Sequence, residues 1–191
     1  MRINKSVLSV SRLIHIYVSM ALLTLMIFFS ITGVTLNHPE WFAEDEAEVS
    51  EADFILSTTL LSIEQQGALL DVLQKKGHLH GGRLVIERDE SELFISDKSP
   101  GQHISITVEL MNGETYVEVT NYGVWALLND LHKGRNSGAF WRLILDLSAA
   151  LIIIFSLSGL ILALAQRRIN RTLITSILTS FSILASYWIF V

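Results

Sequence analysis

The sequence predicts a membrane α-helical protein with three transmembrane helices and one small external α+β domain. Half of its 191 residues are hydrophobic, and its mean hydropathy of +0.45 is high for a soluble domain. Three apolar stretches each approach the roughly 20 residues that cross a ~30 Å hydrocarbon core. Between the first two stretches lies a polar segment of about 100 residues, which is enough for one small domain.

We expect the transmembrane helices over residues 13–37, 140–166 and 173–191. Basic residues in segment 1–12 precede the first helix, as they do in a signal peptide. The apolar run that follows is longer than the hydrophobic region of a signal peptide, which has about 7–15 residues, and no A-x-A cleavage site follows it. The first stretch is therefore interpreted as an uncleaved transmembrane helix.

The distribution of charge predicts the orientation of these helices. Neither segment 1–12 nor the short turn 167–172 contains Asp or Glu. Both are basic, with Arg2, Lys5 and Arg12 in the first and Arg167, Arg168 and Arg171 in the second. The positive-inside rule makes both cytoplasmic. Residues 38–139 then lie outside and hold 18 of the 19 acidic residues, which disfavours nucleic acid as a partner. We expect a multi-pass inner-membrane protein with a cytoplasmic N-terminus and a periplasmic main domain.

Within the external segment, local patterns predict one helix, four strands and a returning helix. Residues 40–53 are acidic and are expected to be an irregular or loosely helical linker. Residues 62–76 have apolar side chains at helical spacing and end before Gly77. Residues 124–132 show the same spacing and lead back to the membrane. The expected strands are residues 83–87, 92–96, 103–110 and 115–120, with Met111-Asn112-Gly113 as a hairpin turn.

Three histidines lie at the ends of the apolar stretches, namely His15, His38 and His132. Ionisable side chains at the edges of membrane spans are candidates for function, and imidazole is a common ligand of haem iron. The chain has no cysteine, which excludes disulfides, iron–sulfur clusters held by thiolates and covalent c-type haem. Any haem here is expected to be haem b.

His38 and His132 are both expected on the external side, where they can meet as the two axial ligands of one haem. Asn37 and Pro39 flank His38, so the first helix ends there and the ring can turn inward. The alternative is that both histidines are interfacial or solvated residues at helix ends.

Three basic residues near His132 are candidates for binding haem propionates: Lys133, Arg135 and Arg142. For Arg142 the alternative is an ion pair with Asp146 one turn later on the same helix face.

His15 lies on the cytoplasmic side, 23 residues before His38. A helix of that length separates the two by roughly 35 Å, so they cannot bind one metal within a chain. If His15 binds iron, its partner is a methionine, solvent or His15 of a second chain, and the last option predicts a homodimer. Otherwise His15 is an interfacial side chain that reaches toward the headgroups.

The first two apolar stretches share a short repeat of small and hydroxyl residues. Such residues let helices pack closely, or make room for a flat macrocycle. The two copies are Phe29-Ser30-Ile31-Thr32-Gly33 and Phe155-Ser156-Leu157-Ser158-Gly159.

At these residues the chain resembles the PepSY-associated transmembrane family, and its external region looks like that family's PepSY-type domain. The segments that carry the resemblance are Arg12-Leu13-Ile14-His15, Thr32-Gly33-Val34-Thr35-Leu36-Asn37-His38, Asp130-Leu131-His132-Lys133-Gly134 and Ser158-Gly159-Leu160. The resemblance implies haem b ligated by His15, His38 and His132. It also implies a haem-dependent oxidoreductase that delivers electrons to ferric iron or a ferric siderophore on the external side.

The larger reductases of this family have more helices and more histidines, so a two-haem path in this chain would need a dimer. The expected partners are membrane lipid, a second copy of the chain, and a quinol or cytoplasmic flavin as electron donor. The alternative function is a non-catalytic membrane module whose PepSY-like domain binds a partner protein, such as a protease or a transporter.

Overall fold

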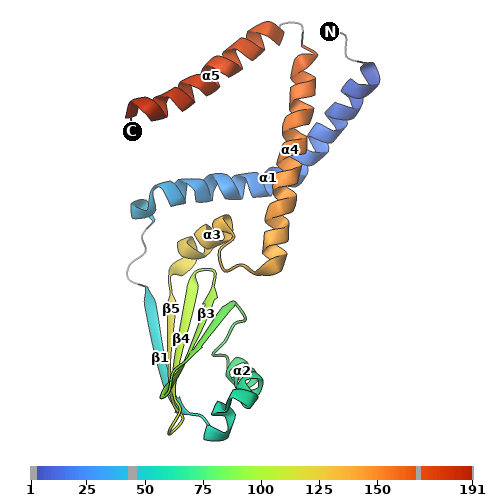
Figure 1. The fold of residues 1–191 in the computed structure, drawn as a ribbon. Helices are drawn as coiled ribbons and strands as arrows, with labels where there is room; N and C mark the ends of the chain where they lie inside the picture. The colour runs from blue at the N-terminus through green and yellow to red at the C-terminus, as the bar shows by residue number, and fades with distance from the viewer. Residues whose placement is uncertain (1–3, 43–46, 167–168, 191) are drawn as a thin grey trace. The chain divides into compact units, whose positions relative to one another are not determined.

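Three long apolar helices form the membrane part of the protein in the computed structural model, which describes residues 4–42, 47–166 and 169–190. They are α1 (Lys5–Asn37), α4 (Gly138–Leu164) and α5 (Ile169–Phe190), labelled in Figure 1. Each is long and apolar enough to cross a membrane, as predicted. Helix α5 begins four residues earlier than expected. Arg2, Arg167 and Arg168, on which the predicted topology partly depends, lie outside the described residues.

The end of α1 follows from the residues that come after it. Pro39 disfavours the helical conformation at the residue before it, and His38 has φ −131° and ψ 63°. The helix therefore ends at Asn37 and a short 3₁₀ turn, Pro39–Trp41, follows. The chain forms two compact units, which are described separately below. One consists of Met1–Met26 and Asp146–Val191, and the other of Ile27–Leu145.

The second unit contains a five-stranded antiparallel sheet in the order β1-β5-β4-β3-β2 (Figure 1). The four predicted strands are present, with a predicted turn in the β4–β5 hairpin. The strands are β1 (Glu48–Ile55), β2 (Arg83–Arg88), β3 (Glu92–Ser99), β4 (Gln102–Glu109) and β5 (Glu114–Asn121).

The prediction of an irregular or helical linker over residues 40–53 was wrong for its second half. Residues Glu48–Ile55 form the edge strand β1, which pairs along its whole length with β5. Seven of its eight residues are exposed, so it lacks the alternation of apolar and polar residues that marks a half-buried strand. Its pairing with β5, about 65 residues later, supplies the hydrogen bonds that a local pattern does not reveal.

One face of the sheet packs against α2 (Gln66–Lys75). Two 3₁₀ turns come before this helix in the chain, Thr58–Leu61 and Ile63–Gln65. The predicted helix 62–76 thus begins as a 3₁₀ turn. Leucines of α2 meet β-branched residues of the central strands, so that the inner face is apolar and the outer face polar. The most deeply buried of these residues are Leu69, Leu73, Ile95, Ile104, Ile106, Val108 and Val117.

Helix α3 (Gly123–Lys133) connects this sheet to the C-terminal end of α1, within the same unit. Asp130, which is buried, accepts a hydrogen bond from the Gly101 amide at 3.1 Å. On the α1 side, the Thr35 hydroxyl donates to the Asn129 side-chain carbonyl at 2.6 Å. Gly134 ends α3 in the left-handed conformation, with φ +66°. The sheet domain therefore holds α3 in place against α1.

Protonation of His78 is expected to make this domain less stable in acid. Its ring stacks on Phe54 with centroids 4.8 Å apart. Burial and the nearby Lys76 lower the pKa of His78 below its usual 6.5. The unfolded chain then takes up a proton before the folded chain does, so stability falls as the pH drops through and below 6.5. The urea midpoint, measured at about pH 7.5 and about pH 5, should fall less in His78→Gln than in the wild type. An equal fall in both proteins would contradict this role of His78.

Candidate functional site

His132 contacts the C-terminal half of α1 through the first copy of the repeat. Its Nδ1 atom lies 2.5 Å from the hydroxyl of Thr32, which is almost fully buried. Phe29 meets the ring edge to face, with centroids 5.1 Å apart. The Thr32 hydroxyl donates its own proton to the Phe28 carbonyl at 2.7 Å. We call this arrangement of Phe28, Phe29, Thr32 and His132 the α1 histidine site.

His15 contacts α4 through the second copy of the repeat. Its Nδ1 atom lies 3.0 Å from the Ser158 hydroxyl and 3.2 Å from the Phe155 carbonyl. The Phe155 ring stacks on the imidazole, with centroids 4.4 Å apart and planes 13° apart. A Cβ atom on Gly159 would lie only 3.1 Å from the His15 ring, so glycine makes room for it. We call this arrangement of His15, Phe155, Ser158 and Gly159 the α4 histidine site.

The two histidine sites share one pattern of hydrogen bonds. In each, a hydroxyl donates to a phenylalanine carbonyl one turn earlier, from Ser158 to Phe155 at 2.8 Å and from Thr32 to Phe28 at 2.7 Å. If each hydroxyl keeps its single proton on the phenylalanine carbonyl, it accepts a hydrogen bond from the histidine. In that arrangement Nδ1 carries the ring proton, and Nε2 of the neutral imidazole holds the lone pair.

This protonation pattern matches that of a metal-binding histidine. Such a residue usually donates its second ring N–H to an oxygen acceptor, which fixes both the tautomer and the orientation of the ring. The repeat thus does more than allow close packing, because each copy binds a histidine from another helix. Sequence reasoning identified the repeat and the histidines separately. It did not identify Thr32 and Ser158 as their hydrogen-bond partners.

His38 has different neighbours from His132. Its ring stacks on Trp41, with centroids 3.9 Å apart, and its Nδ1 atom lies 3.5 Å from a Glu40 carboxylate oxygen. His38 lies just beyond the end of α1, whereas Thr32, the partner of His132, lies within that helix. The two histidines therefore have different neighbours, and their pairing on one haem stays a prediction.

The three predicted propionate partners are all exposed. Arg135 forms an ion pair with Asp130, to which its Nε atom donates at 2.8 Å. Arg142 donates from Nε to the Gly138 carbonyl at 3.3 Å. Lys133 ends α3. Their binding of haem propionates stays a prediction.

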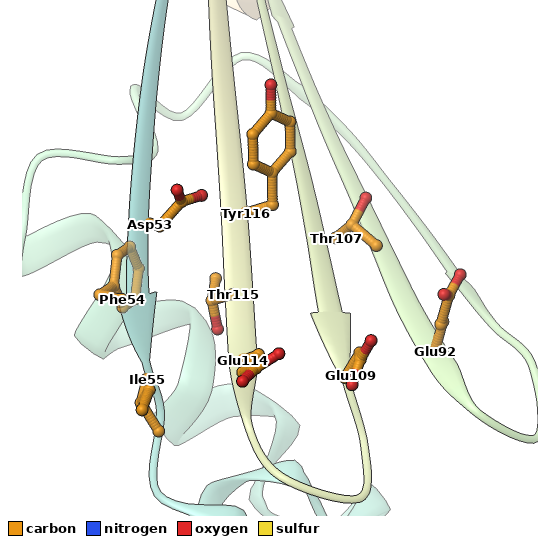
Figure 2. Close-up of a pocket in the computed structure, with 9 residues that line it drawn as sticks. All are labelled: Asp53, Phe54, Ile55, Glu92, Thr107, Glu109, Glu114, Thr115 and Tyr116. Atoms are coloured by element: carbon orange, nitrogen blue, oxygen red, sulfur yellow. The ribbon is translucent and has the colours of Figure 1, made fainter.

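The outer face of the sheet carries an acidic groove of about 520 Å³, shown in Figure 2. Four carboxylates from four strands line it: Asp53, Glu92, Glu109 and Glu114. A hydrogen bond to Glu51, with some burial and other nearby carboxylates, raises the pKa of Tyr116 on this face to about 12. Within residues 4–42, 47–166 and 169–190, no group of three or more His, Cys, Asp or Glu side chains could hold a metal ion.

Replacing Thr32 by valine is expected to loosen α3 where it meets α1. Valine has nearly the same shape but cannot accept the His132 N–H, and one such bond inside a membrane protein contributes about 1 kcal/mol. Hydrogen–deuterium exchange of Gly123–Lys133 in the detergent-solubilised chain should therefore become about fivefold faster. Thr32→Ser keeps the hydroxyl and should exchange at nearly the wild-type rate. Equal exchange in the valine and serine variants would show that this hydrogen bond adds nothing to stability.

In the described residues, three helices that can span a membrane and one small antiparallel sheet domain define a multi-pass membrane protein with a folded extramembrane domain. The model of one family, described as Putative PepSY_TM-like, matches residues 9–190. Since this match covers nearly the whole chain, the protein belongs to that family, and the sheet domain is its PepSY-like domain. No curated protein and no solved structure matches the chain.

Proposed function

We propose that this protein is an inner-membrane reductase that uses haem b to pass electrons to ferric iron or a ferric siderophore on the external side. One observation carries the proposal. His15 and His132 each have Nδ1 within hydrogen-bond distance of a hydroxyl that also contacts a phenylalanine carbonyl, an arrangement that leaves Nε2 to serve as a ligand. Both rings contact helices that can span a membrane. Ionisable side chains are energetically costly inside a membrane, so their presence there indicates a function.

The residues present fit haem b in several respects. Neutral imidazoles with free Nε2 atoms would suit the ligation of haem iron. The chain has no cysteine, which is consistent with non-covalent binding. When bound, haem would supply a one-electron carrier within the membrane. His132 would hold iron through Nε2 while Thr32 fixes the ring, and Lys133, Arg135 or Arg142 would bind the propionates. His38 would serve as second ligand only after leaving Trp41.

The direction of electron flow in this proposal follows from the predicted topology. Lys5, Arg12 and Arg171 are basic residues of the described chain at the ends expected in the cytoplasm. His15 would then mark the side where a membrane quinol or a cytoplasmic flavin donates electrons. The reaction is a one-electron reduction of Fe(III) to Fe(II), with the electron supplied by that donor. Within one chain His15 has no second histidine on its side, so we propose a homodimer.

The visible absorption spectrum of the purified chain tests this proposal. The protein is expressed with ample haem, purified in detergent and measured before and after addition of dithionite. We expect a Soret band and sharp α and β bands on reduction, which ferric iron then reverses. A colourless protein would overturn the proposal and favour the alternative function, a membrane module whose PepSY-like domain binds a partner protein.

A further inference from the structure

A second cavity, of about 590 Å³, lies within the sheet-domain unit, where loop 81–83 faces segment 134–138 and the first turns of α4. Three arginines line it, Arg83, Arg135 and Arg142, together with a serine, an asparagine and four glycines. No carboxylate is among these lining residues. The lining of this cavity is thus positively charged, whereas that of the groove on the outer face of the sheet is negatively charged.

Two of the three arginines have a positive charge that no carboxylate balances. Arg135 is paired with Asp130. Within the described parts of the chain, Arg83 and Arg142 form no ion pair, and Arg142 makes only a 3.3 Å hydrogen bond to Gly138. Two guanidinium groups lining one cavity favour an oxyanion there, because arginine binds phosphate and carboxylate through paired N–H groups.

A serine beside the cavity also has a side-chain oxygen without a partner among the described residues. Ser137 is one of the lining residues, and its hydroxyl oxygen is buried and has no hydrogen-bond partner among the described residues. Ser137 directly precedes α4, a helix of 27 residues that begins at Gly138. The unpaired N–H groups at a helix N-terminus carry partial positive charge, which adds to that of the arginines.

The walls of this cavity are held in place by the rest of the domain. The Asp97 carboxylate is buried and accepts hydrogen bonds from the amides of His80 and Gly81, at 2.8 and 3.1 Å. A Cβ atom on Gly82 would lie 2.3 Å from the Lys98 carbonyl oxygen, so this loop sits directly on β3. On the opposite wall, Arg135 is anchored by Asp130. The cavity is thus preformed.

We propose that this cavity binds a phosphate-type oxyanion, supplied by the headgroup of an anionic lipid. Its position favours a lipid, because Gly138 and Arg142 belong to the start of a helix that can span the membrane. Phe140 and Trp141 follow at the same end, and aromatic residues are common at headgroup level. Free phosphate offers the same chemistry, so the experiment tests both sources.

The first arm of the experiment measures lipid binding to the purified full-length chain in dodecyl maltoside by native mass spectrometry. Dioleoyl phosphatidylglycerol is the probe, and dioleoyl phosphatidylcholine is its zwitterionic control. We expect one tightly held phosphatidylglycerol per chain. Arg83→Gln and Arg142→Gln should each weaken it about tenfold, whereas Arg83→Lys, which keeps the charge, should weaken it less. Lys75→Gln removes one positive charge at the end of α2 and should change nothing.

The second arm titrates inorganic phosphate by calorimetry in a phosphate-free buffer, with the same variants. Binding of phosphatidylglycerol that depends on Arg83 and Arg142 supports the lipid site. Binding of phosphate alone with that dependence supports the oxyanion site but assigns it to a soluble ligand. If both glutamine variants bind both probes as the wild type does, the proposal is wrong. A colourless protein that still binds phosphatidylglycerol in this way would leave the inference intact, since it does not depend on haem.

Discussion

Replacing His132 by alanine is expected to abolish the low-spin haem spectrum of the protein. The substitution removes the Nε2 atom proposed as iron ligand and leaves the buried Thr32 hydroxyl without its N–H donor. Absorption spectra of the dithionite-reduced protein, recorded with equal amounts of chain, measure the loss. His103→Ala is the matched control, because His103 lies on β4 and its ring contacts Ser96 at 2.9 Å. That variant should retain the full spectrum.

The comparison with His38→Ala decides which histidine is the second ligand. Sequence reasoning pairs His38 with His132, so both variants should lose or shift the spectrum. In the structure His38 instead stacks on Trp41, and its side chain is 36% exposed. If His132→Ala loses the spectrum and His38→Ala keeps it, the second ligand lies elsewhere, for instance in a second copy of the chain. A wild-type spectrum in His132→Ala would refute our assignment of this ligand.

The elements that sequence reasoning predicted correctly have a signal within their own residues. Apolar runs of membrane-spanning length mark α1, α4 and α5, and alternation marks the central strands. Strand β1 has no such signal, since nearly all of it is exposed and its stability comes from pairing with a distant strand. Edge strands of this kind are recognised only once the sheet is known.

The histidine sites show a similar division between local and long-range information. Both the histidines and the repeat are visible in the sequence, and the predicted topology puts His38 and His132 at the same end of the membrane. Which turn of α1 receives His132 depends on how α3 packs, through Thr32 and Thr35. That packing depends on Asp130 and Gly101, which tie α3 to the sheet. The contacts of Thr32 and Thr35 with α3 join residues 100 and 94 positions apart, and no spacing rule predicts them.

Replacing Gly113 by alanine is expected to destabilise the sheet domain by about 3 kcal/mol. Gly113 has φ +78° in the β4–β5 hairpin, a conformation that L-residues rarely adopt. A Cβ atom there would also lie only 2.1 Å from the Leu56 carbonyl oxygen. The Leu56 amide donates to the Gly113 carbonyl at 2.8 Å, so relieving the clash would break the contact that ends β1.

Gly77→Ala separates the two causes of this loss. Gly77 has nearly the same φ, +79°, but a Cβ atom there would meet no atom within 4 Å. Only the backbone strain then remains, so we expect a loss of about 1 kcal/mol. Pulse proteolysis of the full-length chain across a urea series gives the free energy of unfolding for both variants. Equal losses in the two variants would mean that the hairpin shifts freely away from Leu56. A larger loss in Gly113→Ala would measure how firmly this contact holds β1 on the sheet.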